Sequence, residues 1–241
     1  MTIRNSPSTP GRWGDHEFVE VWDSQPTMPL KAEQLDILAD VIKDNWRRGA
    51  RILDLGCGTG KVEERIFGRL PVAKFVCADR SEVMLRFARK RLAAHAQQCR
   101  FVCADLNHLD RLDLPERPFR FILLVDVVHE LTDPAKRGLL RFCRQNLAPD
   151  GLVLLVDRIA LDLKHLRGAH VAVLHRLQYL TGTKTGQLSD CFADPRYHDH
   201  ELPYGLESYL RAFRACGLAP AVLHLHFHKA LIAARPQRRS G

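Results

Sequence analysis

A length of 241 residues favours one α/β-sized domain, and a composition of 46% apolar and 27% charged residues excludes global disorder. No apolar run approaches the roughly 18 residues that cross a bilayer, and no signal-peptide core opens the chain. Seven cysteines without a Cys-x-x-Cys pair argue against a disulfide framework. We therefore expect a reduced, cytoplasmic protein, either a monomer or a homodimer, with no membrane partner.

The first part of the chain, residues 1–29, is expected to precede the core. Residues 1–12 are rich in Ser, Thr, Pro and Gly and are predicted to be disordered. Trp13, Phe18 and Trp22 follow in a short segment that the pattern allows to be helical. This segment is expected either to act as an aromatic lid over a pocket or to pack on the core.

Residues 30–156 show the alternating pattern of an α/β core, beginning with a helix predicted over 30–46. Apolar runs predict strands at 51–55, 74–78, 101–104, 119–125 and 152–156, separated by helical patterns at 60–69, 81–98 and 134–147. Ser81 and Asp133 are the expected N-caps of the second and third of these helices. Uninterrupted apolar strands between helices are typical of a doubly wound parallel sheet covered on both faces.

The alternation stops after the fifth strand. Residues 157–205 are predicted to be an insertion that forms a substrate lid, because loops at the carboxyl edge of such a sheet face the ligand. Residues 206–235 are expected to complete the core with a helix over 206–216 and strands at 220–225 and 229–234. These strands are too close together for a crossover helix, so they must form an antiparallel hairpin. The prediction is a seven-stranded, mostly parallel sheet.

The net charge of +8 comes from two segments. A basic ridge, residues 80–100, carries six basic residues against Glu82, and the end of the chain adds Arg235, Arg238 and Arg239. The ridge and the basic tail, residues 236–241, could bind nucleic acid. A solvated helix face and a disordered end explain the same charges, so nucleic acid is the less favoured partner.

A glycine-rich loop follows the first predicted strand. Ile52 to Gly60 reads Ile-Leu-Asp-Leu-Gly-Cys-Gly-Thr-Gly, and glycines let the backbone approach a ligand closely. The dinucleotide fingerprint requires a glycine at the position of Lys61, so nicotinamide binding by that motif is disfavoured. Asp54 would repel a pyrophosphate, and it therefore favours a cationic ligand.

This loop and the strand ends after it resemble the class I S-adenosylmethionine-dependent methyltransferases. The resemblance covers residues 50–156 by motif and 206–235 by topology. It implies S-adenosylmethionine (SAM) as the cofactor and S-adenosylhomocysteine (SAH) as the product. In the family, the first-motif positions surround the methionine part of the cofactor; here they are Asp54, Gly56, Cys57, Gly58 and Gly60.

The resemblance also assigns the residues after the second and third strands. Asp79 would bind both ribose hydroxyls, because a carboxylate can accept two hydrogen bonds from a vicinal diol. Arg80 and Met84 would pack against the adenine ring. Asp105 would accept a hydrogen bond from the adenine amino group, and Leu106 would donate its backbone N–H to the ring.

The fourth predicted strand ends in Asp126-Val-Val-His129. Asp126 could accept a hydrogen bond from the cofactor's ammonium group. His129 could bind substrate or remove a proton from the attacking group, and many relatives keep such a histidine only for packing. Trp22 and Tyr204 are the other expected substrate contacts.

Two histidine clusters are candidate metal sites. One contains His198 and His200, and the other contains His224, His226 and His228. The hairpin must turn near residue 227, which disrupts the second cluster, and we predict no metal site. The resulting expectation is methyl transfer from SAM to an oxygen or nitrogen of a small molecule. The alternatives are an RNA methyltransferase, or a SAM-binding protein without catalysis.

Overall fold

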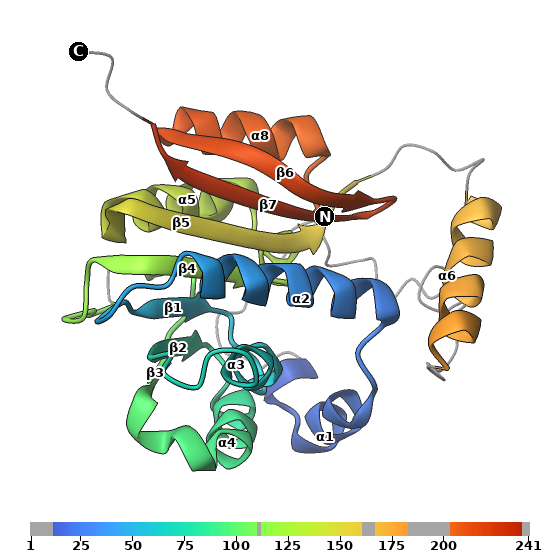
Figure 1. Ribbon diagram of the computed structural model, residues 1–241, viewed down its shortest axis with the longest axis horizontal. Helices are drawn as coiled ribbons and strands as arrows, with labels where there is room; N and C mark the ends of the chain where they lie inside the picture. Colours follow the sequence, from blue (N-terminus) through green and yellow to red (C-terminus); the bar gives the residue numbers. More distant parts are fainter. Residues whose placement is uncertain (1–11, 110–111, 161–166, 183–202, 238–241) are drawn as a thin grey trace, which may run out of the picture.

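The central feature of the computed structural model, which describes residues 12–109, 112–160, 167–182 and 203–237, is a seven-stranded sheet in the order β3-β2-β1-β4-β5-β7-β6 (Figure 1). The strands are β1 (Ile52–Leu55), β2 (Phe75–Asp79), β3 (Cys99–Cys103), β4 (Phe119–Val125), β5 (Leu147–Arg158), β6 (Leu218–His226) and β7 (Lys229–Pro236). Strands β1 to β5 are parallel, and β7 is antiparallel to both β5 and β6. The predicted fold class is confirmed.

Helices cover both faces of this sheet and bury two hydrophobic cores. One core includes side chains of α2 (Pro29–Asp44), α3 (Lys61–Phe67) and α4 (Glu82–Arg91), and the other those of α5 (Asp133–Asn146) and α8 (Leu206–Ala215). Successive residues of β4 alternate between the two cores. Burial on both faces explains why the strand is an unbroken apolar run.

Two helix predictions need correction. Ser81 caps α4 as expected, accepting from Met84 N at 3.1 Å, but α4 ends at Arg91 and a separate 3-10 helix, η2 (Ala93–Gln98), replaces the rest of the predicted helix. His95 leaves helical geometry, and its ring stacks on Phe67 with centroids 3.8 Å apart. The N-cap of α5 is Thr132 rather than Asp133, which is the first helical residue.

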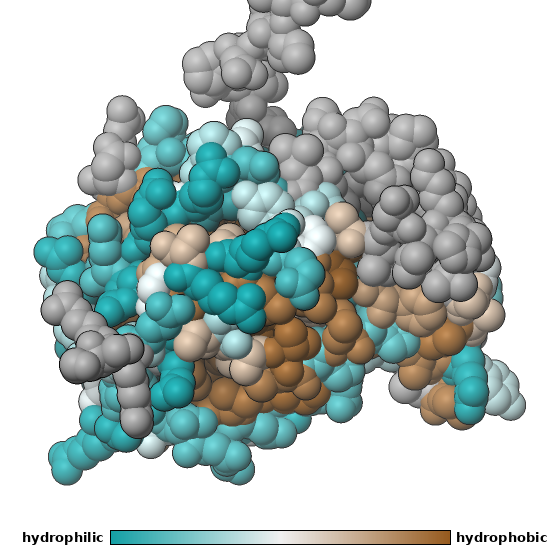
Figure 2. Space-filling view, turned by 90° about the horizontal axis from the view of Figure 1, so that it is seen from above, coloured by the Kyte–Doolittle hydropathy of each residue, from teal (hydrophilic) through white to brown (hydrophobic). Residues whose placement is uncertain are grey.

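The C-terminal hairpin forms as predicted, and its turn includes Phe227 at φ +45°. Strand β6 is the edge of the sheet. The large exposed apolar side chains found in the described strands all lie on β6, at Val222, Leu223 and Leu225. The view from above shows apolar residues bordered by hydrophilic ones (Figure 2).

Only part of the predicted insertion lies in the described residues. Helix α6 (Arg167–Thr181) lies to the side of the sheet, next to α2 (Figure 1). Residues 161–166 and 183–202 fall outside the described residues, as do 1–11 and 238–241, so the predicted lid, disordered start and tail stay predictions. No described helix combines the length and apolar character that a membrane span requires.

Candidate active site

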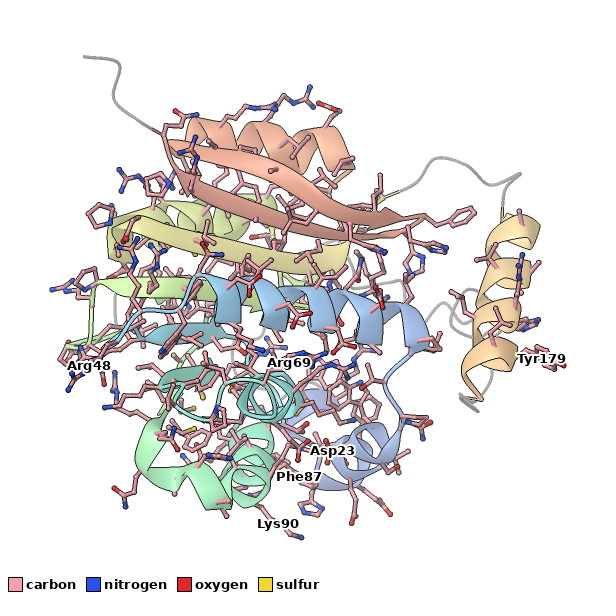
Figure 3. The ribbon with its side chains drawn as sticks, in the orientation of Figure 1. Asp23, Arg48, Arg69, Phe87, Lys90 and Tyr179 are labelled. Atoms are coloured by element: carbon pink, nitrogen blue, oxygen red, sulfur yellow. The ribbon has the colours of Figure 1, made fainter. Side chains whose placement is uncertain are left out.

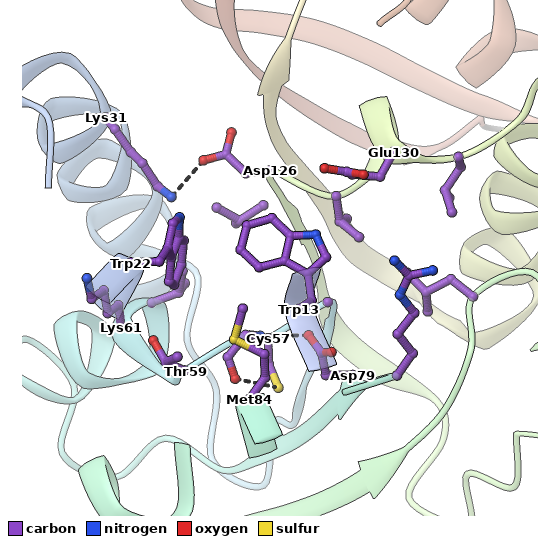
Figure 4. A pocket seen from close by; sticks show the side chains of 18 of the residues that line it. Trp13, Trp22, Lys31, Cys57, Thr59, Lys61, Asp79, Met84, Asp126 and Glu130 are labelled. Atoms are coloured by element: carbon purple, nitrogen blue, oxygen red, sulfur yellow. Dashed lines mark hydrogen bonds and ion pairs between the residues drawn. The ribbon is translucent and has the colours of Figure 1, made fainter. Parts of the chain in front are cut away.

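A cavity of about 1080 Å³, including its open mouth, lies where β1, β2 and β4 end, at the point where the strand order reverses. Its wall brings together ten of the predicted site residues, which are Trp22, Gly56, Cys57, Gly58, Asp79, Arg80, Met84, Asp105, Leu106 and Asp126 (Figure 4). Trp13, Lys31 and Glu130 also line it. Residues that lie far apart in sequence therefore form one wall.

Four predicted site residues lie away from this wall. Asp54 is fully buried beneath the glycine loop, and Gly60 packs against α4. His129 is only 4% exposed, and the ring of Tyr204 packs edge-on against Tyr209 at 5.3 Å. Direct contact of these four with cofactor or substrate stays a prediction.

The glycine loop turns sharply because the backbone of three of its residues, Gly56, Gly58 and Gly60, lies in the left-handed region. Gly56 has φ +88°, and a Cβ there would lie 2.6 Å from Val127 Cγ2. Its N–H donates to Ala78 O at 2.7 Å, which ties the loop to β2. Gly58 has φ +55° and would meet no atom within 4 Å, so its surroundings are open.

Replacing Gly56 with alanine should therefore cost more than the same change at Gly58. Both variants place a Cβ at positive φ, but only Gly56→Ala also collides with Val127. We expect a loss of about 1–3 kcal/mol in the free energy of unfolding for Gly56→Ala. Urea denaturation followed by circular dichroism measures both losses. Equal losses would contradict the close approach of Val127.

Asp79 at the end of β2 is held by the backbone of two neighbouring turns. Its Oδ2 accepts from Gly58 N at 3.0 Å and its Oδ1 from Ser81 N at 2.8 Å. Burial raises the pKa of Asp79, although these two N–H groups oppose the rise. Each oxygen keeps a lone pair, so the fixed carboxylate can accept hydrogen bonds from two neighbouring hydroxyl groups.

Asp126 at the end of β4 carries two ion pairs. Lys31 Nζ lies 2.6 Å from its Oδ2, and Lys229 Nζ contacts its Oδ1. Burial by itself would raise the pKa of Asp126, but the two ammonium groups hold it well below its usual value. Because Lys31 precedes the motifs and comes from α2, sequence reasoning did not identify it.

The N-terminal aromatic segment crosses the cavity. It comprises the 3-10 helix η1 (Arg12–Gly14) and helix α1 (His16–Ser24). The rings of Trp13 and Trp22 lie 5.5 Å apart, and Figure 4 shows the Trp13 indole between Asp126 and Asp79.

Several contacts hold this segment. Ser81 Oγ donates to Trp13 O at 2.5 Å, and Arg12 pairs with Glu130 at 3.2 Å. Thr59 Oγ1, in the glycine loop, donates to Asp23 Oδ1 at 2.6 Å. The arrangement agrees with a covering role for the aromatic segment, while its motion stays a prediction.

A buried dyad lies beside the cavity. His129 Nδ1 is 2.5 Å from Asp157 Oδ1, and Asp157 also accepts from His129 N at 3.0 Å, Arg158 N at 2.7 Å and Tyr209 OH at 3.2 Å. A carboxylate at Nδ1 holds the proton there and leaves Nε2 free to accept one. Nε2 lies 3.8 Å from the carboxylate of Glu130, which lines the cavity. Sequence reasoning identified neither Asp157 nor Tyr209.

One cluster in the described part of the chain has the spacing of metal ligands. Asp126, His129 and Asp157 offer ligand atoms within 4.8 Å of one another. Lys31 and Lys229 already contact the Asp126 carboxylate, and their charges would repel a metal ion. Outside this cluster, His224 Nδ1 lies 3.2 Å from Gln34 Nε2, whereas His198 and His200 lie beyond the described residues.

Comparison with known proteins gives a consistent result. Residues 52–151 match the family described as "Methyltransferase domain". The trans-aconitate 2-methyltransferase of Rhodopseudomonas palustris (strain BisA53) is 35% identical over 96 residues, which are 40% of this chain and 33% of that protein. This chain therefore matches about a third of that relative's length.

Two solved structures show similarity in fold. An O-methyltransferase family protein from Burkholderia thailandensis aligns with a TM-score of 0.65 at 16% identity, covering 94% of this chain and 62% of the other. A DhpI–SAH complex aligns with a TM-score of 0.58 at 16% identity, covering 93% and 94% of the two chains. At this level of identity the likeness shows the shared fold alone.

Proposed function

We propose that this chain, which belongs to the class I S-adenosylmethionine-dependent methyltransferases, transfers the methyl group of SAM to an oxygen or nitrogen of a small molecule. The proposal rests on one observation: carboxylates that suit a cofactor line the same cavity that lies next to a proton-accepting dyad. Fixed carboxylates at Asp79 and Asp126 suit a nucleoside and an amino group, and the His129–Asp157 dyad can accept a proton.

The residues of the wall fit SAM. Asp79 offers a fixed carboxylate to the ribose diol, and Met84 and Leu106 offer apolar surface to adenine. The Lys31–Asp126 pair presents one cation and one anion, which matches the carboxylate and ammonium groups of an amino acid. In this proposal both residues exchange their mutual contact for contacts with the cofactor.

Bound SAM supplies a methyl group on a sulfonium, which is an activated leaving group. The protein then has to align the acceptor with that methyl group and exclude water. Trp13 and Trp22 cover the cavity and would keep it dry.

His129 is the proposed general base. With Asp157 fixing the proton on Nδ1, Nε2 would accept the proton that the acceptor loses, and Asp157 would stabilise the resulting imidazolium. Glu130, which pairs with Arg12, lines the cavity, and its carboxylate lies 3.8 Å from Nε2. In this proposal the Arg12–Glu130 ion pair moves aside when the acceptor reaches Nε2.

A small acceptor is favoured over RNA because the basic ridge is partly neutralised. Arg89 forms an ion pair with Glu82, and Arg100 forms one with Glu116. Arg91 pairs with both Asp23 and Glu64. Lys90 on α4 extends into solvent (Figure 3). An RNA substrate would instead require a surface of available cations.

An acceptor screen tests the proposal. The protein is incubated with SAM and panels of hydroxyl, carboxylate and amine compounds, and SAH formation is followed by mass spectrometry. We expect SAH to form with at least one small acceptor and not with total RNA. Turnover with RNA alone would contradict a small-molecule acceptor, and SAM binding without turnover on any panel would favour a non-catalytic role.

A further inference from the structure

Two buried carboxyl groups lie directly beneath the glycine loop. Asp54 lies on β1, one residue before its end, and Glu63 lies in the first turn of α3; both side chains are 0% exposed. Their carboxyl groups interact with each other. As two carboxylates, they have no hydrogen-bond partner among the described residues at any of their four oxygens.

Two adjacent carboxylates without donors cannot both stay charged in a protein interior. Each buried charge loses its hydration, and the two like charges repel. A proton held between the groups removes one charge and supplies the missing donor. Burial, the largest influence, and the negative charge of Asp79 raise the pKa of Glu63 to about 7, while the interaction with Asp54 lowers it.

The thiols next to the Asp54–Glu63 pair keep their protons, so the pair is the group that gains or loses one. Cys57 in the loop and Cys77 on β2 are buried thiols. The Cys77 thiol lowers and burial raises the pKa of Cys57, to about 12, so the thiols remain protonated. Asp79 adds a negative charge and Lys31 a positive one.

Charges in the cavity affect the ionisation of the Asp54–Glu63 pair. The ammonium of Lys31, which lines the cavity, favours the ionised form of Asp54 from across the loop. A second cation in the same cavity would act in the same direction. SAM carries one net positive charge, because its sulfonium adds to a balanced ammonium and carboxylate, whereas SAH carries none.

We propose that the Asp54–Glu63 pair holds a proton in the free protein and releases it to solvent when SAM, but not SAH, enters the cavity. The inference rests on the proposed cofactor. Because proton release accompanies the cationic ligand alone, rising pH favours SAM over SAH. The pair thereby helps the protein to prefer the methyl donor and to release the product after the positive charge is lost.

Isothermal titration calorimetry of the full chain near pH 7, without acceptor, tests the inference. SAM and SAH are titrated in buffers of different ionisation enthalpy. The dependence of the binding heat on the buffer gives the number of protons released. We expect the wild type to release more protons on binding SAM than on binding SAH. In Glu63→Gln, whose amide can donate to Asp54, the two ligands should release equal numbers of protons. Glu64→Gln, on the exposed part of the same helix, is the matched control and should keep the wild-type difference.

A measurement on the wild type alone gives a second test, independent of how Glu63→Gln folds. The ratio of SAM affinity to SAH affinity should rise by up to about tenfold between pH 6 and pH 8. A ratio that stays constant, or an equal number of released protons for wild type and Glu63→Gln, would overturn the inference while leaving the cofactor assignment intact. No binding heat with either ligand would overturn the proposed function and this inference with it.

Discussion

Replacing His129 with asparagine is expected to lower kcat by about 10²–10⁴-fold while leaving SAM affinity nearly unchanged. The ring lies beside the cavity rather than on its wall, so its loss removes a proton acceptor without removing a cofactor contact. Steady-state kinetics with an acceptor from the screen measures kcat, and calorimetry measures SAM affinity. Unchanged turnover would show that His129 only packs.

A second substitution separates chemistry from packing. Asp157→Asn keeps the shape of the side chain but loses the charge that holds the proton on His129 Nδ1. We expect kcat to fall and its pH profile to change, while SAM affinity stays close to that of the wild type. Tyr209→Phe, which removes one donor to Asp157, is the milder control.

Replacing Asp79 with alanine is expected to weaken the binding of both SAM and SAH by at least about tenfold. The substitution removes the proposed acceptor for the two ribose hydroxyls. It also leaves the N–H groups of Gly58 and Ser81 without their present partner. Calorimetry with both ligands measures the loss, and thermal unfolding reports any cost to the fold.

The isosteric Asp79→Asn variant is the control. It retains one acceptor oxygen, so its affinity should lie between those of the wild type and Asp79→Ala. Since burial raises the pKa of Asp79, wild-type affinity should also fall as acidification protonates this carboxyl group. Equal affinity in all three proteins would place the ribose elsewhere.

The parallel sheet was predictable because each central strand is buried on both faces and is therefore a short apolar run. Asp79 and Asp126 each stand at the carboxyl end of such a run, where ligands bind in this architecture. Asp157 follows the apolar run of β5 in the same way. The same signal could have identified it, and the prediction that residues 157–205 belong to the insertion obscured it.

Other features depend on contacts that no local pattern contains. Lys31 reaches Asp126 from a helix that lies before the first motif, and Tyr209 reaches Asp157 from a helix after the insertion. His95, the non-helical residue inside η2, stacks on Phe67, which belongs to another helix. Spacing within one element carries no information on such pairs.

Calorimetric titration of the wild-type protein with SAM and SAH decides whether the cavity is a cofactor site. We expect SAM and SAH each to bind at one site. Asp79→Ala should reduce the affinity for both ligands, and adenosine alone should bind more weakly than either. The absence of binding heat for both ligands in correctly folded protein would contradict a methyltransferase function for this chain.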